Sequence, residues 1–145
     1  MSLEVYSAQM NRAKRDPDFL DVSRASGTEG IFLAPSWGIL SPALEVRREA
    51  EKMLKASRRL EGDEGLSLRM LAEINLEKSW NTYVVAYLNE MKESFINHPD
   101  AWKKLLARPR VVLGCYCAHR EHCHTALLRV EILPQLGAID KGELQ

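Results

Sequence analysis

The sequence runs Arg110-Val111-Val112-Leu113-Gly114 and continues directly into Cys115-Tyr116-Cys117-Ala118-His119-Arg120-Glu121-His122-Cys123-His124. Within the first five residues, Val111-Val112-Leu113 form an apolar run without alternation, which predicts a central strand buried on both faces. Residues 125–136 predict an amphipathic helix that ends at Gly137, with an inward face made of Leu128, Ile132 and Leu136. A buried strand that leads into a helix is typical of an α/β fold.

Other segments predict the rest of the sheet and its helices. Residues 4–9, 19–23 and 31–34 predict three short strands. A helix is expected to begin at Ser41-Pro42 and to end at Gly62, and further helices are expected over residues 67–74, 76–97 and 100–107. We therefore expect a single α/β domain over residues 1–145. Its small parallel or mixed sheet would have helices on both faces, in a Rossmann-like three-layer arrangement.

Composition limits the class of protein and its partners. The chain has 20 Lys and Arg residues against 20 Asp and Glu residues, so it lacks the basic excess of a broad nucleic-acid binder. We find no apolar run long enough to cross a bilayer and no signal-peptide pattern at the N-terminus. The 3 cysteines are odd in number and clustered, unlike a secreted disulfide framework. We therefore expect a cytoplasmic protein with metal or thiol chemistry and no membrane partner.

The segment from Cys115 to His124 is the candidate working site because of its position. Ligands of open α/β sheets bind beyond the carboxyl ends of the strands. A thiol at the start of the following helix has its pKa lowered toward the reactive thiolate. In the first interpretation, Cys115 or Cys117 is an activated thiol and His124 or His119 is the nearby acid–base group. The spacing from Cys115 to Arg120 also suits a short anion-binding loop.

Two other interpretations of this segment stay open. Zinc would be held by Cys115, Cys117 and Cys123 with one histidine, either His124, His119 or His122. The ligand types suit zinc but the spacing does not, because Cys123 and His124 are adjacent, so zinc is not the favoured cofactor. In the third interpretation, the cysteines are small buried residues and the histidines are solvated loop residues.

The chain resembles the family of domains of unknown function numbered 488. The resemblance rests first on Gly-Cys-Tyr-Cys, the short polar loop, Cys-His, the helix, Leu-Gly-Ala and a late Gly-Glu at 142–143. It extends to Tyr6-Ser7-Ala8, Leu20-Asp21-Val22-Ser23, Phe32-Leu33-Ala34-Pro35-Ser36-Trp37, the spaced pattern Tyr83, Tyr87, Met91 and Ser94, and Trp102 with Leu105-Leu106. Members occur in bacteria and phages. The resemblance implies an α/β fold with the cysteine loop at one edge of a shared pocket, and it brings no settled activity.

One position departs from the family pattern. The family usually has Arg directly after Cys-His, where this chain has Thr125. Arg120 or Arg129 would have to replace that Arg in holding an anion.

The other strand ends should converge on the cysteine loop if the fold is correct. Arg24 would hold a carboxylate or phosphate and Trp37 would stack on a ring, although a solvated Arg24 and a core-covering Trp37 are the plainer alternatives. Glu143 lies near the C-terminus, where disorder is common. The predicted ligand-binding set is Tyr6, Ser23, Arg24, Pro35, Ser36, Trp37, Arg120 and Cys123.

The leading hypothesis is therefore a domain that binds or processes a small anionic, nucleotide-like molecule at the cysteine loop, with Cys115, Cys117 and His124 as its catalytic residues. A zinc-stabilised structural or interaction module is the second hypothesis. A phage or mobile-element accessory protein that binds a host partner is the third. The sequence leaves open whether the chain is an enzyme.

Overall fold

The computed structural model describes residues 2–24 and 29–144. Contacts divide the chain into two compact units, a sheet unit of Met1–Pro35 with Leu88–Gln145 and a hairpin unit of Ser36–Tyr87. The elements follow one another as β1 Glu4–Gln9, α1 Met10–Ala13, β2 Phe19–Asp21, η1 Ile31–Leu33, α2 Trp37–Ser57, α3 Gly62–Asn97, α4 Pro99–Leu106, β3 Arg110–Cys115, η2 Arg120–His122, α5 His124–Leu127, η3 Leu128–Ile132, α6 Leu133–Gln135 and β4 Ile139–Glu143. The prediction of one domain over the whole chain stays a prediction.

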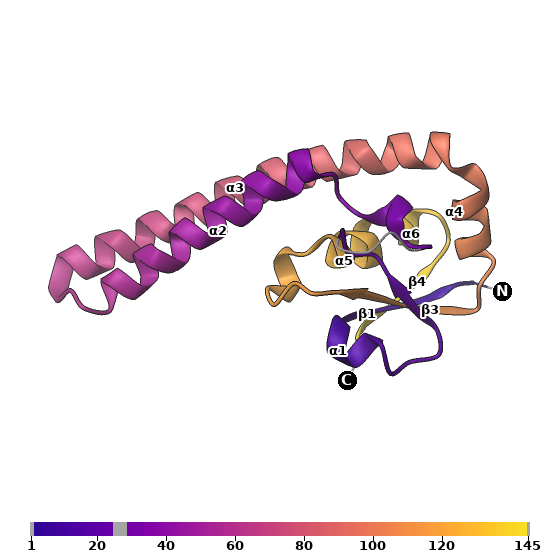
Figure 1. Ribbon diagram of the computed structural model, residues 1–145, viewed down its shortest axis with the longest axis horizontal. Helices are drawn as coiled ribbons and strands as arrows, with labels where there is room; N and C mark the ends of the chain where they lie inside the picture. The colour runs from indigo at the N-terminus through magenta and orange to yellow at the C-terminus, as the bar shows by residue number, and fades with distance from the viewer. Residues whose placement is uncertain (1, 25–28, 145) are drawn as a thin grey trace. The chain divides into compact units, whose positions relative to one another are not determined.

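Among the described residues, the sheet has four strands in the order β2-β3-β1-β4. Every pairing is parallel, so the carboxyl ends of all strands meet at one edge. Val111, Val112 and Leu113 in β3 are fully buried, as the unbroken apolar run predicted. The expected α/β sheet is confirmed, and Figure 1 shows α1 on one side of it and α5 on the other.

Side chains alternate across the sheet and give its two faces different characters. On the α1 face, Ala8, Ala13 and Val112 form a small core, and Tyr6 and Phe19 pack against it. Gly114 is required there because a Cβ atom on it would lie 2.8 Å from Cε2 of Phe19 and 2.9 Å from Cβ of Ala13. Ser7 points to the opposite face, where its hydroxyl contacts Glu143 of β4 and Arg129 of the helix after the cysteine loop.

The helix after the cysteine loop contains one irregular turn that the sequence did not reveal. η3 is a π-helical segment between α5 and α6. Its extra residue shifts the inward face, so that Leu128 and Leu133 are fully buried while Leu136 is 38% exposed. The prediction of an inward Leu136 was therefore wrong, because it assumed an uninterrupted 3.6-residue period.

Residues 31–34 do not form the predicted strand. They form the single turn η1, in which the Leu33 N–H bonds the Gly30 carbonyl and the Ala34 N–H bonds the Ile31 carbonyl. The turn is held by tertiary contacts, since the hydroxyl of Ser94 donates to the Phe32 carbonyl at 2.7 Å. Four apolar residues suit a strand or a buried turn equally well, so packing decided the outcome.

The hairpin unit consists of α2 and the first part of α3. The predicted start at Ser41-Pro42 was one turn late, because α2 begins at Trp37 and contains Pro42 near its start. The predicted helices over 67–74 and 76–97 are one continuous helix, α3. No Gly or Pro interrupts the sequence from Leu66 to Asn97, so nothing ends the helix between them.

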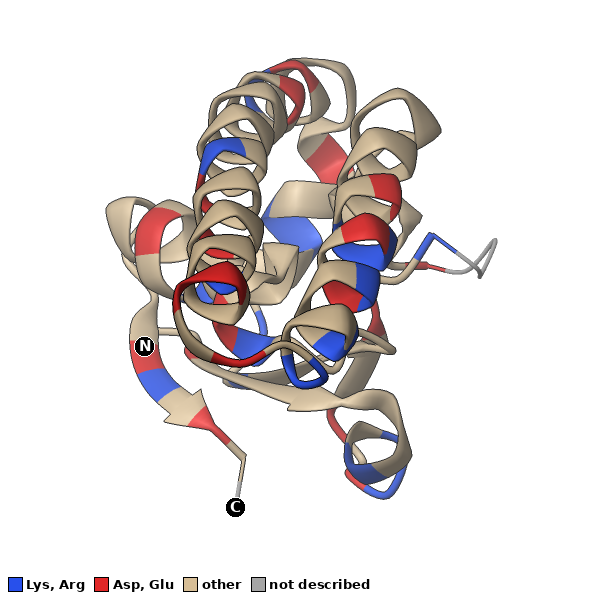
Figure 2. Cartoon of the chain, turned by 90° about the vertical axis from the view of Figure 1, so that its left-hand side faces the viewer, with Lys and Arg blue, Asp and Glu red and all other residues tan. Residues whose placement is uncertain are grey.

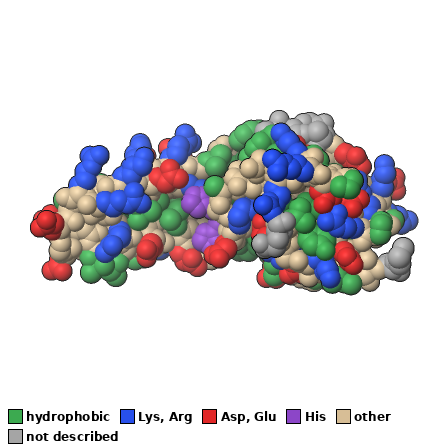
Figure 3. Space-filling model, turned by 90° about the horizontal axis from the view of Figure 1, so that it is seen from below, with side chains coloured by type: hydrophobic (Ala, Val, Ile, Leu, Met, Phe, Trp, Pro, Cys, Tyr) green, Lys and Arg blue, Asp and Glu red, His purple; other side chains and the backbone are tan. Residues whose placement is uncertain are grey.

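Charge is mixed over the hairpin unit. Both of its helices carry acidic and basic residues along their length (Figure 2). The face drawn in Figure 3 likewise carries both signs on this unit, with apolar side chains between them. None of the described helices is long and apolar enough to cross a lipid bilayer.

Candidate functional site

The candidate site lies at the carboxyl edge of the sheet. β3 ends at Cys115, the loop and η2 follow, and Cys123 is the residue directly before α5. β1 ends at Gln9, whose side-chain amide donates to the Tyr116 carbonyl at 3.4 Å. β4 ends at Glu143 on the other side of β1. Parallel pairing therefore brings three strand ends and one helix start to the same place.

Two sulfur atoms and one imidazole nitrogen converge in this loop. The ligand atoms of Cys115, Cys123 and His124 all lie within 4.8 Å of one another. The three residues are only 8%, 2% and 4% exposed. Buried polar groups need partners, and the fold supplies them because Cys123 directly precedes α5, His124 begins it, and the start of this helix faces the end of β3.

The orientation of His124 is set by a backbone contact. Its Nε2 lies 2.7 Å from the carbonyl oxygen of Val22, which can only accept a hydrogen bond. Nε2 therefore carries the proton, and Nδ1 presents its lone pair 3.8 Å from Sγ of Cys123. Val22 directly follows β2, so the fourth strand end also contributes to the site through its backbone.

The surroundings of Cys115 favour its thiolate form. The Cys123 thiol hydrogen-bonds the sulfur of Cys115 and lowers the pKa of that thiol, and burial opposes this effect. The backbone N–H of Cys117 and the charge of Arg120 lower it further. Beside it, the hydroxyl of Thr125 donates to Sγ of Cys123 at 3.3 Å. The pair can therefore supply an electron-rich sulfur.

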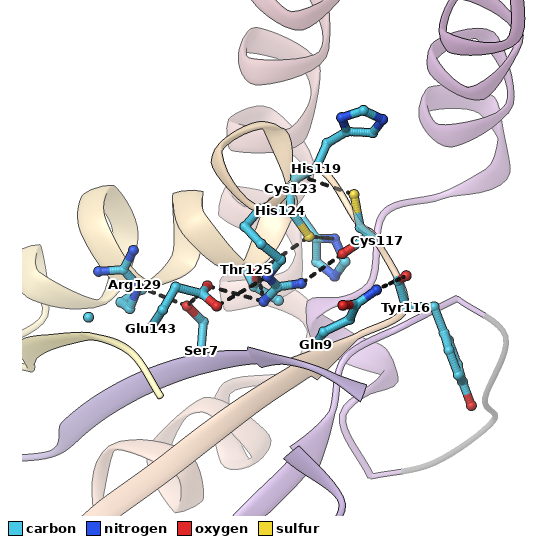
Figure 4. Close-up of polar contacts among 12 residues, drawn as sticks. Ser7, Gln9, Tyr116, Cys117, His119, Cys123, His124, Thr125, Arg129 and Glu143 are labelled. Atoms are coloured by element: carbon cyan, nitrogen blue, oxygen red, sulfur yellow. Dashed lines mark hydrogen bonds and ion pairs between the residues drawn. The ribbon is translucent and has the colours of Figure 1, made fainter. Parts of the chain in front are cut away.

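Cys117 lies at the rim of the cluster. It is half-buried, and its Sγ donates to the carbonyl of His119 at 3.4 Å. Figure 4 shows its sulfur directed to that carbonyl. Cys117 is thus the thiol of the loop that solvent reaches most readily.

A network of charged side chains borders the sulfur cluster (Figure 4). Nε and Nη2 of Arg120 each donate to a carboxylate oxygen of Glu143 at 3.2 Å, and Nη1 donates to the Cys117 carbonyl at 3.0 Å. The buried hydroxyl of Ser7 donates to Glu143 at 2.6 Å and accepts from Nε of Arg129 at 2.9 Å. Arg129 also pairs with Asp140. The network ties β1, β4 and the helix to the cysteine loop.

A family model covers most of this site. It is the model DUF488-N3a, described as the active DUF488-N3 subclade, and it matches residues 46–136, more than half of the 145 residues. The chain belongs to this DUF488 family. Comparison with curated proteins and with solved structures found no match. The matched span of the DUF488 model includes the cysteine loop and Arg129, whereas Ser7 and Glu143 lie outside it.

Within this DUF488 site, the structure gathers part of the predicted residue set. Cys115, Cys123 and His124 converge, Arg120 borders them, and Cys117 lies at their rim. In the charged network, Arg120 bonds Glu143 and Arg129 bonds Ser7. These are the two arginines that could replace the family's usual Arg. Thr125, which occupies that Arg's place, is fully buried against Cys123.

The other predicted residues of the sheet unit are not among the converging donors. The ring of Tyr6 lies on the α1 face, 4.7 Å below the guanidinium of Arg110. Ser23 is buried with its hydroxyl bonded to Asp21, Arg24 follows it, and Pro35 is buried at the end of the first segment of the sheet unit. Ser36 and Trp37 start the hairpin unit, and the indole is 53% exposed, so it is not a core cover.

Sequence reasoning missed three residues of the network. Ser7, Asp140 and Glu143 were not predicted as site residues, whereas Arg129 was expected only as a possible replacement for the family's usual Arg. Glu143 lies in β4 and bonds Ser7. One signal pointed to them, because the late Gly-Glu pair is part of the DUF488 resemblance. The other signal was the end of the first strand, where Ser7 is adjacent to the predicted Tyr6.

Proposed function

We propose that this chain binds and processes a small anionic molecule, nucleotide-like in its charge, at the cysteine loop. The convergence of Cys115, Cys123 and His124 at the carboxyl edge of the sheet carries the proposal. This edge is where α/β sheets bind ligands, and sulfur and imidazole are the two groups there with acid–base and nucleophilic chemistry.

Each group has a role in this proposal. The sulfur of Cys115 is the reactive group, since its neighbours favour the thiolate. Nδ1 of His124 takes up or supplies a proton, because its tautomer leaves that nitrogen as the acceptor. Arg120 and Arg129 orient the anionic part of the ligand through their forked N–H groups. The word "active" in the description of the family model also supports a catalytic site.

Anion binding with a matched pair of arginine variants tests the proposal. Inorganic phosphate and adenosine monophosphate are titrated calorimetrically into the full chain, purified without chelator. Arg120→Gln should weaken binding about tenfold, because a charge-assisted hydrogen bond is lost. Arg110→Gln is the control, since Arg110 also pairs with carboxylates but lies at the opposite end of β3. Absence of binding, or equal losses in both variants, would contradict the proposal.

A further inference from the structure

The ion pairs of the charged network bear on how an anion is held at the cysteine loop. The inference drawn from them rests on the anion binding of the proposed function. Arg120 bonds both oxygens of Glu143, and Arg129 pairs with Asp140. Each guanidinium charge is therefore already balanced by a carboxylate. The arginines can orient an anionic ligand at this edge, but two neutralised pairs add little net charge. Tight binding therefore also needs a cation close to the sulfur atoms that can accept a ligand oxygen.

The sulfur cluster has the donor atoms and spacing to bind such a charge. A tetrahedral zinc ion with bonds of about 2.0–2.3 Å places its ligand atoms about 3.5–3.8 Å apart. Sγ of Cys123 and Nδ1 of His124 are 3.8 Å apart, and no pair within the group exceeds 4.8 Å. Side-chain shifts of about 1 Å would bring all three atoms to bonding distance.

The contacts around the cluster are those that a metal site requires. A metal-bound histidine donates its other ring N–H to a fixed acceptor, and Nε2 of His124 does so to the Val22 carbonyl. Bound thiolates are stabilised by hydrogen bonds, and Thr125 supplies one to Cys123. Both contacts are buried, so they hold His124 and Cys123 in place before any ion arrives.

We propose that Cys115, Cys123 and His124 hold a zinc ion whose fourth position faces the anionic ligand. With the ion bound, the sulfur of Cys115 and Nδ1 of His124 act as its ligands, and the ion takes over the direct contact with the anionic ligand. Sulfur and imidazole donors select zinc over the oxygen-preferring magnesium and calcium. Two thiolates and one zinc ion are neutral together, and an open position on the ion can accept a phosphate-like oxygen. Three protein ligands with one open position are typical of catalytic zinc sites.

Cys117 distinguishes an open site from a closed one. It is the remaining thiol of the loop. Its Sγ bonds the His119 carbonyl at 3.4 Å and its side chain hydrogen-bonds Cys123, but it lies outside the group of three donors that converge. A structural zinc site would recruit it as a fourth protein ligand. The open site does not need it, so Cys117→Ser is the matched control for the cysteine variants.

Metal analysis of the full chain tests the inference. Protein purified without chelator is analysed for zinc by mass spectrometry, and its fold is checked by circular dichroism. The wild type and Cys117→Ser should each hold close to one zinc ion. Cys123→Ser and His124→Gln should weaken zinc binding by about 100-fold or more. The glutamine amide can still donate to the Val22 carbonyl, so this variant keeps the main contact of His124.

Several outcomes would overturn the inference. A wild type without zinc, even after zinc is added back, removes the site. Equal zinc in all variants places the metal elsewhere in the chain. Loss of zinc from Cys117→Ser shows a closed four-ligand site, which supports a structural module and removes the open position.

Cobalt substitution separates this inference from the proposed function. Co²⁺ in the same site should give sulfur-to-cobalt charge-transfer bands, and added inorganic phosphate should shift its visible spectrum. Cobalt bands that phosphate does not change, in protein that still binds phosphate, overturn the open position. If the protein binds zinc but neither phosphate nor adenosine monophosphate, the proposed function fails and the three-ligand metal site is retained.

Discussion

Arg110 lies at the amino end of β3, and Arg120 lies beyond its carboxyl end. Both arginines bond carboxylates. At the amino end, Arg110 bonds Asp16 at 2.7 Å and Asp18 at 2.9 Å, with its guanidinium over the ring of Tyr6. At the carboxyl end, Arg120 bonds Glu143 beside the sulfur cluster. The pairing is the same, but only the second pair has thiols and a histidine next to it. Ion pairing alone therefore does not mark a functional site, whereas the chemistry beside the pair does.

The largest effect in this comparison is expected from breaking the pair at the amino end. Arg110→Gln leaves Asp16 and Asp18 without their shared partner and should lower the free energy of unfolding by about 2 kcal/mol. Urea unfolding measures the loss. Zinc content and phosphate affinity should not change, because this arginine lies at the far end of the strand.

A second arginine provides the control for that measurement. Arg108 pairs with Glu29, whose side chain is 61% exposed. Arg108→Gln should cost about 0.5 kcal/mol or less, since exposed ion pairs contribute little. Losses of equal size in the two variants would contradict the view that the pair at the amino end anchors the sheet.

An intermediate effect is expected from the serine that joins the two sides of the charged network. Ser7→Ala removes the hydroxyl shared by Glu143 and Arg129 and should cost about 1 kcal/mol of stability. It should also weaken phosphate binding severalfold, because both Arg120 and Arg129 lose part of their support. Calorimetric titration measures the second effect.

Ser23→Ala is matched to this variant. Ser23 is also a buried serine bonded to a carboxylate, that of Asp21, but its side chain does not contact the network. It should lower stability to a similar extent and leave phosphate binding unchanged. Equal effects of the two variants on binding would show that Ser7 acts only through stability.

Local patterns in the sequence predicted the central part of the site. The apolar run of β3 ends at Cys115, and the rule that ligands bind beyond strand ends placed the working site there. The convergence of Cys115, Cys123 and His124 follows from that position, since the strand end and the helix start are only a few residues apart. Interactions that are short in sequence are the ones that periodicity can reveal.

Long-range pairing explains why the other half of the network was missed. β4 contains one large apolar residue, Ile139, so its sequence lacks the signal of a strand. It forms because the backbone of β1 pairs with it, and the bond between Ser7 and Glu143 spans 136 positions of the chain. An edge strand of this kind is decided by the sheet it joins, and its own residues carry little information.

A further effect, the pH dependence of the pair at the amino end, sharpens the comparison. The hydrogen bonds from Arg110 hold the pKa of Asp16 below its ordinary value of 3.8, against the effect of burial. A lowered folded-state pKa stabilises the protein fully above pH 3.8, and the contribution is lost as the pH falls from there through the folded value. The difference in unfolding free energy between the wild type and Asp16→Asn, about 1 kcal/mol near pH 6, should therefore shrink below pH 3.8. Urea midpoints between pH 3 and pH 6 measure it, and a difference that stays constant over this range would show that Asp16 is not held by its charge.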